Sequence, residues 1–293
     1  MALTLAQIEA RVDTAGRHPS WAFLRRHPLL VIGGVLLAVM ALIALAAPWL
    51  APYDPIEMNV LQRLKPASTQ HWFGTDAMGR DVFSRVLWGG RVSMIVGLSV
   101  ALAATSIGVL IGMVAGFSRL ADALIMRVMD GMMAIPGILL AVALMALMRA
   151  SIETVVIAIA VPEIPRVVRL VRSLVLVIRE QPYVQAAEAI GTRFHWILLR
   201  HVLPNAVTPL IVQGTFIAAS AVLFEAYLSF LGAGTPPEIP SWGNMMAEGR
   251  AVVQLAFNIV LFPGIFLGLT VLAINLLGDG LRDLLDPKIA RRL

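Results

Sequence analysis

Long uncharged runs alternate with short charged segments along the chain, and this alternation predicts helices that cross a membrane. A run of about 18 or more apolar residues is long enough to cross the hydrocarbon core of a bilayer. The run over 151–175 is weaker because Glu163 and several arginines interrupt it, but an even number of spans fits the charges better. The predicted spans cover residues 28–53, 92–118, 131–148, 151–175, 202–224 and 251–278.

The arginines and lysines orient these spans. With the N-terminus in the cytoplasm, most of the 23 basic residues fall in segments that stay inside, as the positive-inside rule requires. A short amphipathic helix is expected from Ala2 to about Ala15 on the cytoplasmic face. The expected organisation is a cytoplasmic segment 1–27, a first helix 28–50, an extracytoplasmic loop 51–91, a five-helix core 92–278 and a cytoplasmic tail 279–293, with both termini inside.

Composition supports a membrane protein and excludes an ordinary soluble one. Apolar residues make up 59% of the 293 residues and charged residues 14%, against about 25% charged residues in soluble domains. The basic residues lie between apolar segments, where they set topology, so membrane lipid and not nucleic acid is the expected partner. The predicted fold class is all-α, a polytopic membrane protein with six transmembrane helices.

The chain lacks the motifs of an enzyme or of an ATP-binding protein. Its two lysines, Lys65 and Lys288, do not follow a glycine, so there is no phosphate-binding Walker A loop. His195 and His201 are the nearest approach to a metal motif, but they are six residues apart and have no carboxylate at ligand spacing. We therefore expect no catalytic residue, no metal site and no cofactor bound by this chain.

Glycines spaced four residues apart occur in two of the predicted spans. Gly108, Gly112 and Gly116 form consecutive G-x-x-x-G repeats in the second span, and Gly264 and Gly268 form another in the sixth. Such spacing lets two helix backbones approach closely, so both sets predict helix packing.

A polar segment over about 179–204 separates the fourth and fifth spans and is predicted to lie in the cytoplasm. Its pattern predicts a helix from Tyr183 to Ala189, a break at Gly191, and a second short amphipathic helix. Pro204 then marks the entry into the fifth span. Small exposed side chains on the first helix would let a partner protein approach closely.

This segment resembles the EAA loop of bacterial ABC importer permeases. The resemblance rests on Gln185-Ala-Ala-x-x-x-Gly191 followed by Leu203-Pro204. In that family the loop docks into a cleft of the ATPase subunit and transmits its closure. The family usually has Glu at the position of Gln185, and Glu188 is an alternative acidic group. The residues that the resemblance assigns to ATPase coupling are Gln185, Ala186, Ala187, Glu188, Gly191, Leu203 and Pro204.

Further motifs resemble the C-type permease subunit of dipeptide and oligopeptide importers. They are the stretch 71–85, Leu228-Ser-Phe-Leu-Gly232, Pro236-Pro237, Trp242-Gly243 and the stretch 278–287. Pro162-Glu163-Ile164-Pro165 departs from the expected pattern at the end of the fourth span. This departure raises a question about the local helix geometry.

The resemblance implies an ABC importer half-channel with the type I permease fold in the bacterial inner membrane. The implied partners are a second homologous permease subunit, two ATP-binding subunits that hold ATP and Mg, and an extracytoplasmic peptide-binding protein. The first loop and the segment 232–250 would face the binding protein, with Arg80, Asp81 and Trp242 as candidate contacts. Arg80 and Asp81 are also expected to fix the loop by pairing internally.

Two acidic residues in the spans are candidates for the translocation pathway, since ionisable groups inside a membrane are functional candidates by default. Asp130 lies at the cytoplasmic edge of the third span and Glu225 near the outer end of the fifth. The alternative for Asp130 is a structural pair with Arg127 or Arg166. The alternatives for Glu225 include a contact with the binding protein.

An ion-gradient-driven secondary transporter is the alternative function. It would require discontinuous helices or paired charges near the midplane, but only Pro136 and Pro209 interrupt a span near its middle and no inverted repeat is visible. Members of the resembled family transport dipeptides, oligopeptides, glutathione, opine-like conjugates or nickel chelates, and the sequence does not select one of these substrates.

Overall fold

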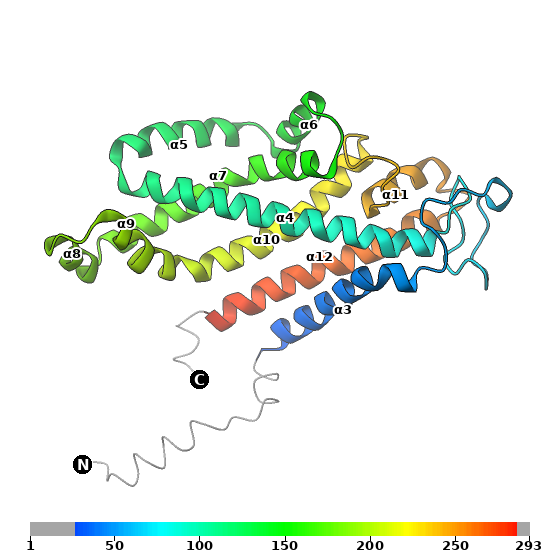
Figure 1. The fold of residues 1–293 in the computed structure, drawn as a ribbon, viewed down its shortest axis with the longest axis horizontal. Helices are drawn as coiled ribbons and strands as arrows, with labels where there is room; N and C mark the ends of the chain where they lie inside the picture. Colours follow the sequence, from blue (N-terminus) through cyan, green and yellow to red (C-terminus); the bar gives the residue numbers. More distant parts are fainter. Residues whose placement is uncertain (1–26, 286–293) are drawn as a thin grey trace, which may run out of the picture.

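The computed structural model describes residues 27–285, whose helices lie side by side in one elongated bundle (Figure 1). Its long helices are α3 (Pro28–Leu50), α4 (Val82–Phe117), α7 (Ile152–Arg179), α10 (Leu203–Phe230) and α12 (Asn258–Leu285). Shorter elements are α5 (Arg119–Ala134), α6 (Gly137–Leu147), α8 (Pro182–Ala189), α9 (Phe194–Ile197), α11 (Trp242–Gly249) and the turns η1 (Val60–Gln62), η2 (Leu198–Val202) and η3 (Arg250–Val252). The all-α prediction is confirmed. The amphipathic helix expected from Ala2 to Ala15 lies outside the described residues.

Four helices of the described chain are long and apolar enough to cross a membrane. They are α3, α4, the continuous helix Leu198–Phe230 and α12, and a bent pair formed by α5 and α6 gives a fifth candidate. The helix predicted over 151–175 is present as α7, but it is not among these candidates. The polytopic character is thus confirmed, whereas the count of six spans stays a prediction.

The third predicted span differs most from the structure. Instead of one helix over 131–148, α5 begins at Arg119 and is followed by α6, with a bend of 93° between them. Pro136 lies at the bend, lacks a backbone N–H and disfavours the helical conformation of the residue before it. Accordingly, Ile135 is extended, with φ −92° and ψ 129°.

Two other helices begin well away from the predicted start of their span. Helix α4 begins at Val82 and not at residue 92, because the Asp81 carboxylate caps its N-terminus by accepting a hydrogen bond from Ser84 N at 2.7 Å. Helix α12 begins at Asn258 and not at residue 251, because the preceding residues form the turn η3 and a short connection.

The seam between α4 and α7 explains the first set of glycines. A Cβ atom added at Gly108, Gly112 or Gly116 would lie 2.5, 2.7 or 2.6 Å from the Cβ of Val167, Val171 or Val175, respectively. The packing prediction is therefore confirmed for this set. For the second set the described residues show no close helix contact: an added Cβ at Gly268 would meet nothing within 4 Å, and one at Gly264 would meet Met246 Sδ at 3.7 Å.

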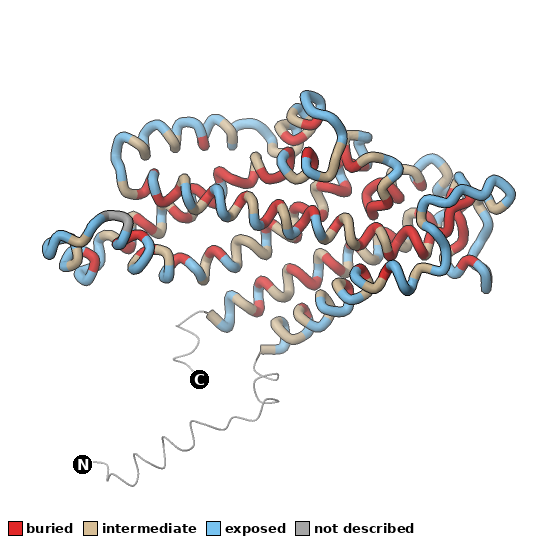
Figure 2. The backbone as a smooth tube through the Cα atoms, in the orientation of Figure 1, coloured by how far each residue is buried: buried red, intermediate tan, exposed pale blue. Residues whose placement is uncertain are grey.

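Burial follows the centre of the bundle, and the outer faces of α3 and α4 are exposed (Figure 2). The exposed residues on these faces are large and apolar, as lipid requires: Ile32, Val35, Leu42, Leu45, Leu98, Leu102 and Leu110. The segment around α8 and α9 lies at one end of the bundle, and the loop over 51–81 and α11 lie at the other (Figure 1).

Candidate functional site

The polar segment between α7 and α10 has the predicted arrangement of helix, break and helix. Helix α8 ends in a Schellman motif, in which Thr192 N donates to Ala187 O at 3.0 Å and Gly191 N donates to Glu188 O at 2.9 Å. Gly191 has φ +80°, a conformation that glycine adopts without a steric penalty. The motif turns the chain sharply and fixes the angle between α8 and the following helix.

One side of α8 packs on the bundle and the other is open. Val184 is fully buried and joins the main apolar core, whereas Gln185, Ala186 and Glu188 are exposed and Ala187 is half-buried. The Gln185 amide makes only a long contact of 3.5 Å, from Nε2 to Glu180 O. This side therefore presents small side chains and two polar groups that a partner protein can reach.

The second half of the segment runs directly into α10. Ile197, Leu198 and Val202 are buried, which confirms the apolar face of the second predicted helix. The turn η2 is π-helical and joins α9 to α10 without a break, so the long helix begins before Pro204. Leu203 is half-buried and Pro204 is exposed in the first turn of α10.

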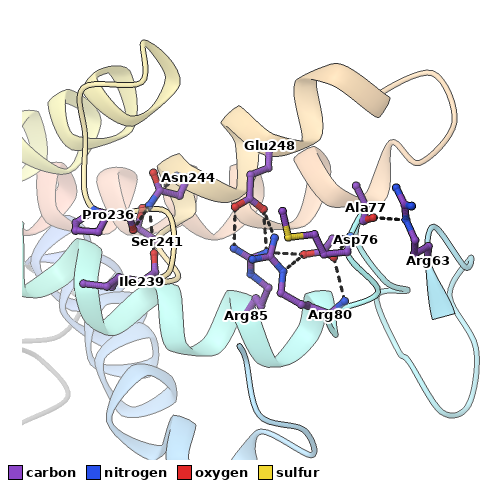
Figure 3. A network of polar contacts seen from close by, with 11 residues as sticks. Arg63, Asp76, Ala77, Arg80, Arg85, Pro236, Ile239, Ser241, Asn244 and Glu248 are labelled. Carbon is purple, nitrogen blue, oxygen red and sulfur yellow. Dashed lines mark hydrogen bonds and ion pairs between the residues drawn. The ribbon is translucent and has the colours of Figure 1, made fainter. Parts of the chain in front are cut away.

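A buried network of charges ties the loop over 51–81 to α11 at the opposite end (Figure 3). Asp76 accepts from Arg80 Nε at 2.6 Å and from Arg85 Nη1 at 2.5 Å. Glu248 of α11 accepts from the same two arginines, at 2.5 and 2.9 Å. Two carboxylates thus alternate with two guanidinium groups, which compensates charges that burial would otherwise penalise.

The pKa of Asp76 shows which influence dominates in this network. Burial alone would raise the pKa of this carboxyl, but the guanidinium groups of Arg85 and Arg80 and the backbone N–H groups of Arg80 and Met78 outweigh burial. The net effect holds the pKa of Asp76 below its usual range. Asp76 is therefore a permanent anion at neutral pH.

The structure places the three candidate binding-protein contacts inside this end of the bundle. Arg80, Asp81 and Trp242 are 4%, 3% and 2% exposed. Asp81 pairs with His71 Nδ1 at 2.9 Å, and the Trp242 indole N–H donates to Val86 O at 3.0 Å. As expected, Arg80 and Asp81 both form pairs within the protein, but they pair with other residues and not with each other. In this conformation all three position the surrounding loops and offer little surface to a partner.

The two candidate pathway carboxylates have very different surroundings. Glu225 is fully buried in α10, where its oxygens accept from the Ser229 hydroxyl at 2.9 Å and the Ser93 hydroxyl at 3.2 Å. Asp130 is exposed on α5 and pairs with Arg169 of α7 at 2.8 Å. Arg169, and not Arg127 or Arg166, is therefore the partner of Asp130.

Asn244 and Glu248 of α11 were not singled out by sequence reasoning. Asn244 Nδ2 donates to Thr235 Oγ1 at 2.9 Å and to Pro236 O at 3.0 Å, and it thereby shapes the connection after α10. Figure 3 shows Asn244 beside Pro236 and Ser241. The role of Glu248 has no local signal in the sequence, since its partners Arg80 and Arg85 are 168 and 163 residues away. The partners of Asn244 lie only a few residues before it, but the position of Asn244 after the capping residue Ser241 indicates no more than a helix start. Within residues 27–285 no three His, Cys, Asp or Glu side chains come together as a metal site.

Comparisons with known proteins cover the whole chain. The profile described as "Binding-protein-dependent transport system inner membrane component" matches residues 108–291. The profile described as "N-terminal TM domain of oligopeptide transport permease C" matches residues 19–67.

Individual relatives agree with these profiles. A probable peptide ABC transporter permease protein from Sinorhizobium fredii is 50% identical over 100% of both chains. A dipeptide transport system permease protein from Alkalihalophilus pseudofirmus is 42% identical over 91% of this chain and 88% of the relative. A glutathione transport system permease protein from Escherichia coli is 42% identical over 93% of this chain and 90% of the relative.

Proposed function

The chain belongs to the inner membrane components of binding-protein-dependent transport systems, as the permease subunit of an ABC importer, and we propose that it forms half of a peptide translocation pathway. Membership implies ATPase and binding-protein partners and a location in the inner membrane. The proposed substrate class is peptides or peptide-like solutes, in line with relatives named for peptides, dipeptides and glutathione. The proposed partner in the membrane is a second, homologous permease subunit.

The observation that supports this function best is the position of α8. It protrudes from one end of the bundle, follows α7 closely and is joined through α9 and η2 to α10, and both long helices run toward the opposite end (Figure 1). We assign ATPase docking to its exposed face and to Gly191, Leu203 and Pro204. A movement of α8 would then turn α7 and α10 together, and ATP binding would shift the bundle between two arrangements.

The proposed topology has six spans and both termini in the cytoplasm. In it, α7 is the fourth span despite its charges, and the bent pair α5–α6 is the third. The loop over 51–81 and the segment 232–250 face the binding protein, and the buried network of Asp76, Arg80, Arg85 and Glu248 holds these two parts together. ATP and Mg belong to the partner ATPase subunits.

Asp130 and Glu225 are the residues proposed for the translocation pathway. Asp130 is supported by its exposure, because a side chain that lines a pathway has to reach water. Glu225 could contribute only after a rearrangement that exposes it, since it is enclosed by hydroxyl groups.

Co-purification tests the assembly directly. The tagged chain is extracted gently from its native membrane, and the proteins recovered with it are identified by mass spectrometry. We expect a second permease and ATP-binding subunits, and we expect peptide uptake to stop with vanadate and to continue with a protonophore. Recovery of the chain alone, together with uptake that a protonophore abolishes, would favour an ion-coupled carrier.

A further inference from the structure

The exposed stripe of α7 differs in chemistry from those of its neighbours. On α3 and α4 the exposed positions hold no charged residue, and their large side chains are apolar. On α7 three successive exposed positions, one helical turn apart, are Arg166, Arg169 and Ser173. A guanidinium group facing lipid is costly, so this stripe faces water or protein.

The stripe borders a hollow of about 490 Å³ between α7, α10 and α5. Arg166, Arg169 and Ser173 line it from α7, and Gln213 and Phe216 line it from α10. All the charged groups that line it are therefore cationic, and Gln213 adds an amide. The Ser173 hydroxyl donates to Leu170 O at 2.7 Å, so the donors left for a ligand come from the two arginines and the Gln213 amide, which suits an anionic ligand.

An acidic residue outside the lining holds each arginine in place. Arg166 Nη1 donates to both carboxylate oxygens of Glu163 at 3.0 Å, and Arg169 Nη2 donates to Asp130 at 2.8 Å. Glu163 is only 2% exposed, whereas the side chain of Arg166 is 47% exposed. Among the described residues the hydrogen bonds of Arg166 involve only Nη1, so its Nε and Nη2 donors are available to a ligand.

The position of Glu163 suggests a function for the segment Pro162–Pro165, which departs from the expected family pattern. Helix α7 continues through both prolines, and Glu163, Ile164 and Pro165 are buried. The helix therefore presents Glu163 to the interior and Arg166 to the hollow, one turn further along. Proline removes main-chain hydrogen bonds within a helix and so destabilises it. A role for Glu163 and Arg166 in ligand binding would account for a segment that is unfavourable for the helix.

We propose that this hollow binds the carboxylate of the transported peptide, with Arg166 as the main cationic group and Gln213 and Ser173 as polar neighbours. A guanidinium group matches a carboxylate with parallel hydrogen bonds, which no other side chain reproduces. Glu163 is a positioning residue for Arg166. The inference rests on the proposed peptide transport and makes this subunit a contributor to substrate selection after release from the binding protein.

The test compares two forms of one peptide in the reconstituted complete transporter. Uptake is measured for a peptide with a free C-terminal carboxylate and for its C-terminal amide, each at a concentration that saturates the binding protein. We expect Arg166→Gln to lower the ratio of acid to amide uptake about tenfold, which corresponds to about 1.4 kcal/mol. Arg166→Lys keeps the charge and should retain part of the ratio.

The matched control is Arg127→Gln, which removes an exposed arginine of α5 outside the lining of the hollow. It should leave the ratio unchanged. An independent measurement uses the absence of cysteine from this chain: in a Ser173→Cys variant, the free-acid peptide should slow labelling by a maleimide and the amide should not.

The outcomes separate the inference from the proposed function. An unchanged ratio in Arg166→Gln would overturn the inference, and so would failure of that variant to assemble with the second permease, because the stripe would then be a subunit interface. If the wild-type transporter takes up neither peptide, the proposed peptide transport itself is wrong.

Discussion

Gly191 shows at the residue scale how a single backbone conformation can determine a contact surface. Its φ of +80° closes the Schellman motif at the end of α8, and an added Cβ would meet nothing within 4 Å. Within this chain, the effect of a substitution there therefore comes from backbone conformation and not from a clash. Residues other than glycine pay about 1–2 kcal/mol in this region, and β-branched residues pay more.

We expect Gly191→Val to abolish transport while the chain still inserts into the membrane, because α8 would be displaced from its docking angle. Gly191→Asn should retain activity, since asparagine tolerates positive φ. Gly131→Val is the control, because Gly131 also has open space around its Cβ but lies within helix α5 at an ordinary φ. Peptide uptake and membrane content are the measurements, and normal uptake by Gly191→Val would refute the docking role.

Asp76 gives a second residue-scale prediction, on stability and pH. Asp76→Asn leaves Arg80 and Arg85 with Glu248 as the remaining acid of the network, and losing one partner of a buried pair costs about 3–5 kcal/mol. The native pKa is depressed, so the carboxylate stabilises the fold above the pKa of the unfolded chain, about 3.9. This stability is lost as the pH falls through the native pKa.

Thermal unfolding in detergent measures this effect. The variant should unfold at a lower temperature than the wild type at pH 7, and the difference should shrink below about pH 4. Asp54→Asn, at an exposed position of the same loop, is the control and should change little. A difference that is independent of pH would argue against an ionic role for Asp76.

At the scale of elements, the seam of α4 and α7 has no room for a side chain at Gly108, Gly112 or Gly116. Gly112→Leu would force a Cβ to within 2.7 Å of Val171 Cβ and 2.9 Å of Val168 O. The two helices form a large part of the core, so they would have to separate. Overpacking of this kind costs about 1–3 kcal/mol or more.

We therefore expect Gly112→Leu to lower the unfolding temperature and the yield of folded protein. Gly268→Leu provides the matched control, because it changes the same kind of motif on α12 where the added Cβ meets nothing within 4 Å. Thermal unfolding of the isolated chain is the measurement. Equal destabilisation by the two substitutions would contradict the assignment of the first motif to packing.

At the scale of the whole molecule, the two polar regions lie at opposite ends of the bundle (Figure 1). One end is the exposed face of α8, and the other is the loop over 51–81, held to α11 by buried charges. If the bundle spans the membrane as proposed, these ends face opposite compartments. The lack of cysteine makes this arrangement easy to test with single-cysteine variants.

Leu61 and Ile190 are suitable positions, because their side chains are 88% and 83% exposed. A membrane-impermeant maleimide applied to intact spheroplasts should label Leu61→Cys and leave Ile190→Cys unlabelled. After lysis both should react. Labelling of both variants, or of neither, in intact spheroplasts would show that the two ends do not lie on opposite sides.

Local patterns predicted much of this protein from the sequence. Uncharged runs predicted α3, α4, α10 and α12, because the length of a span is set by the bilayer and not by tertiary contacts. The Gly191 turn was also predictable, since a glycine after an alanine-rich helix is a local signal. Pro136 was also visible as an interruption. The continuous apolar run nevertheless favoured a single helix, and the sharp bend between α5 and α6 was not predicted.

Only the tertiary structure decided which groups meet across long distances in sequence. Glu248 reaches Arg80 and Arg85 over more than 160 residues, and Asp130 pairs with Arg169 and not with the nearer Arg127. The same holds for the two glycine motifs: the α4 motif packs closely on α7, whereas the α12 motif, with the same spacing, has no such close contact among the described residues. The sequence determines where helices form and where they turn, because those choices depend on neighbouring residues. Which helix faces are covered, and hence which charges are buried or open to a ligand, depends on how the helices pack against each other.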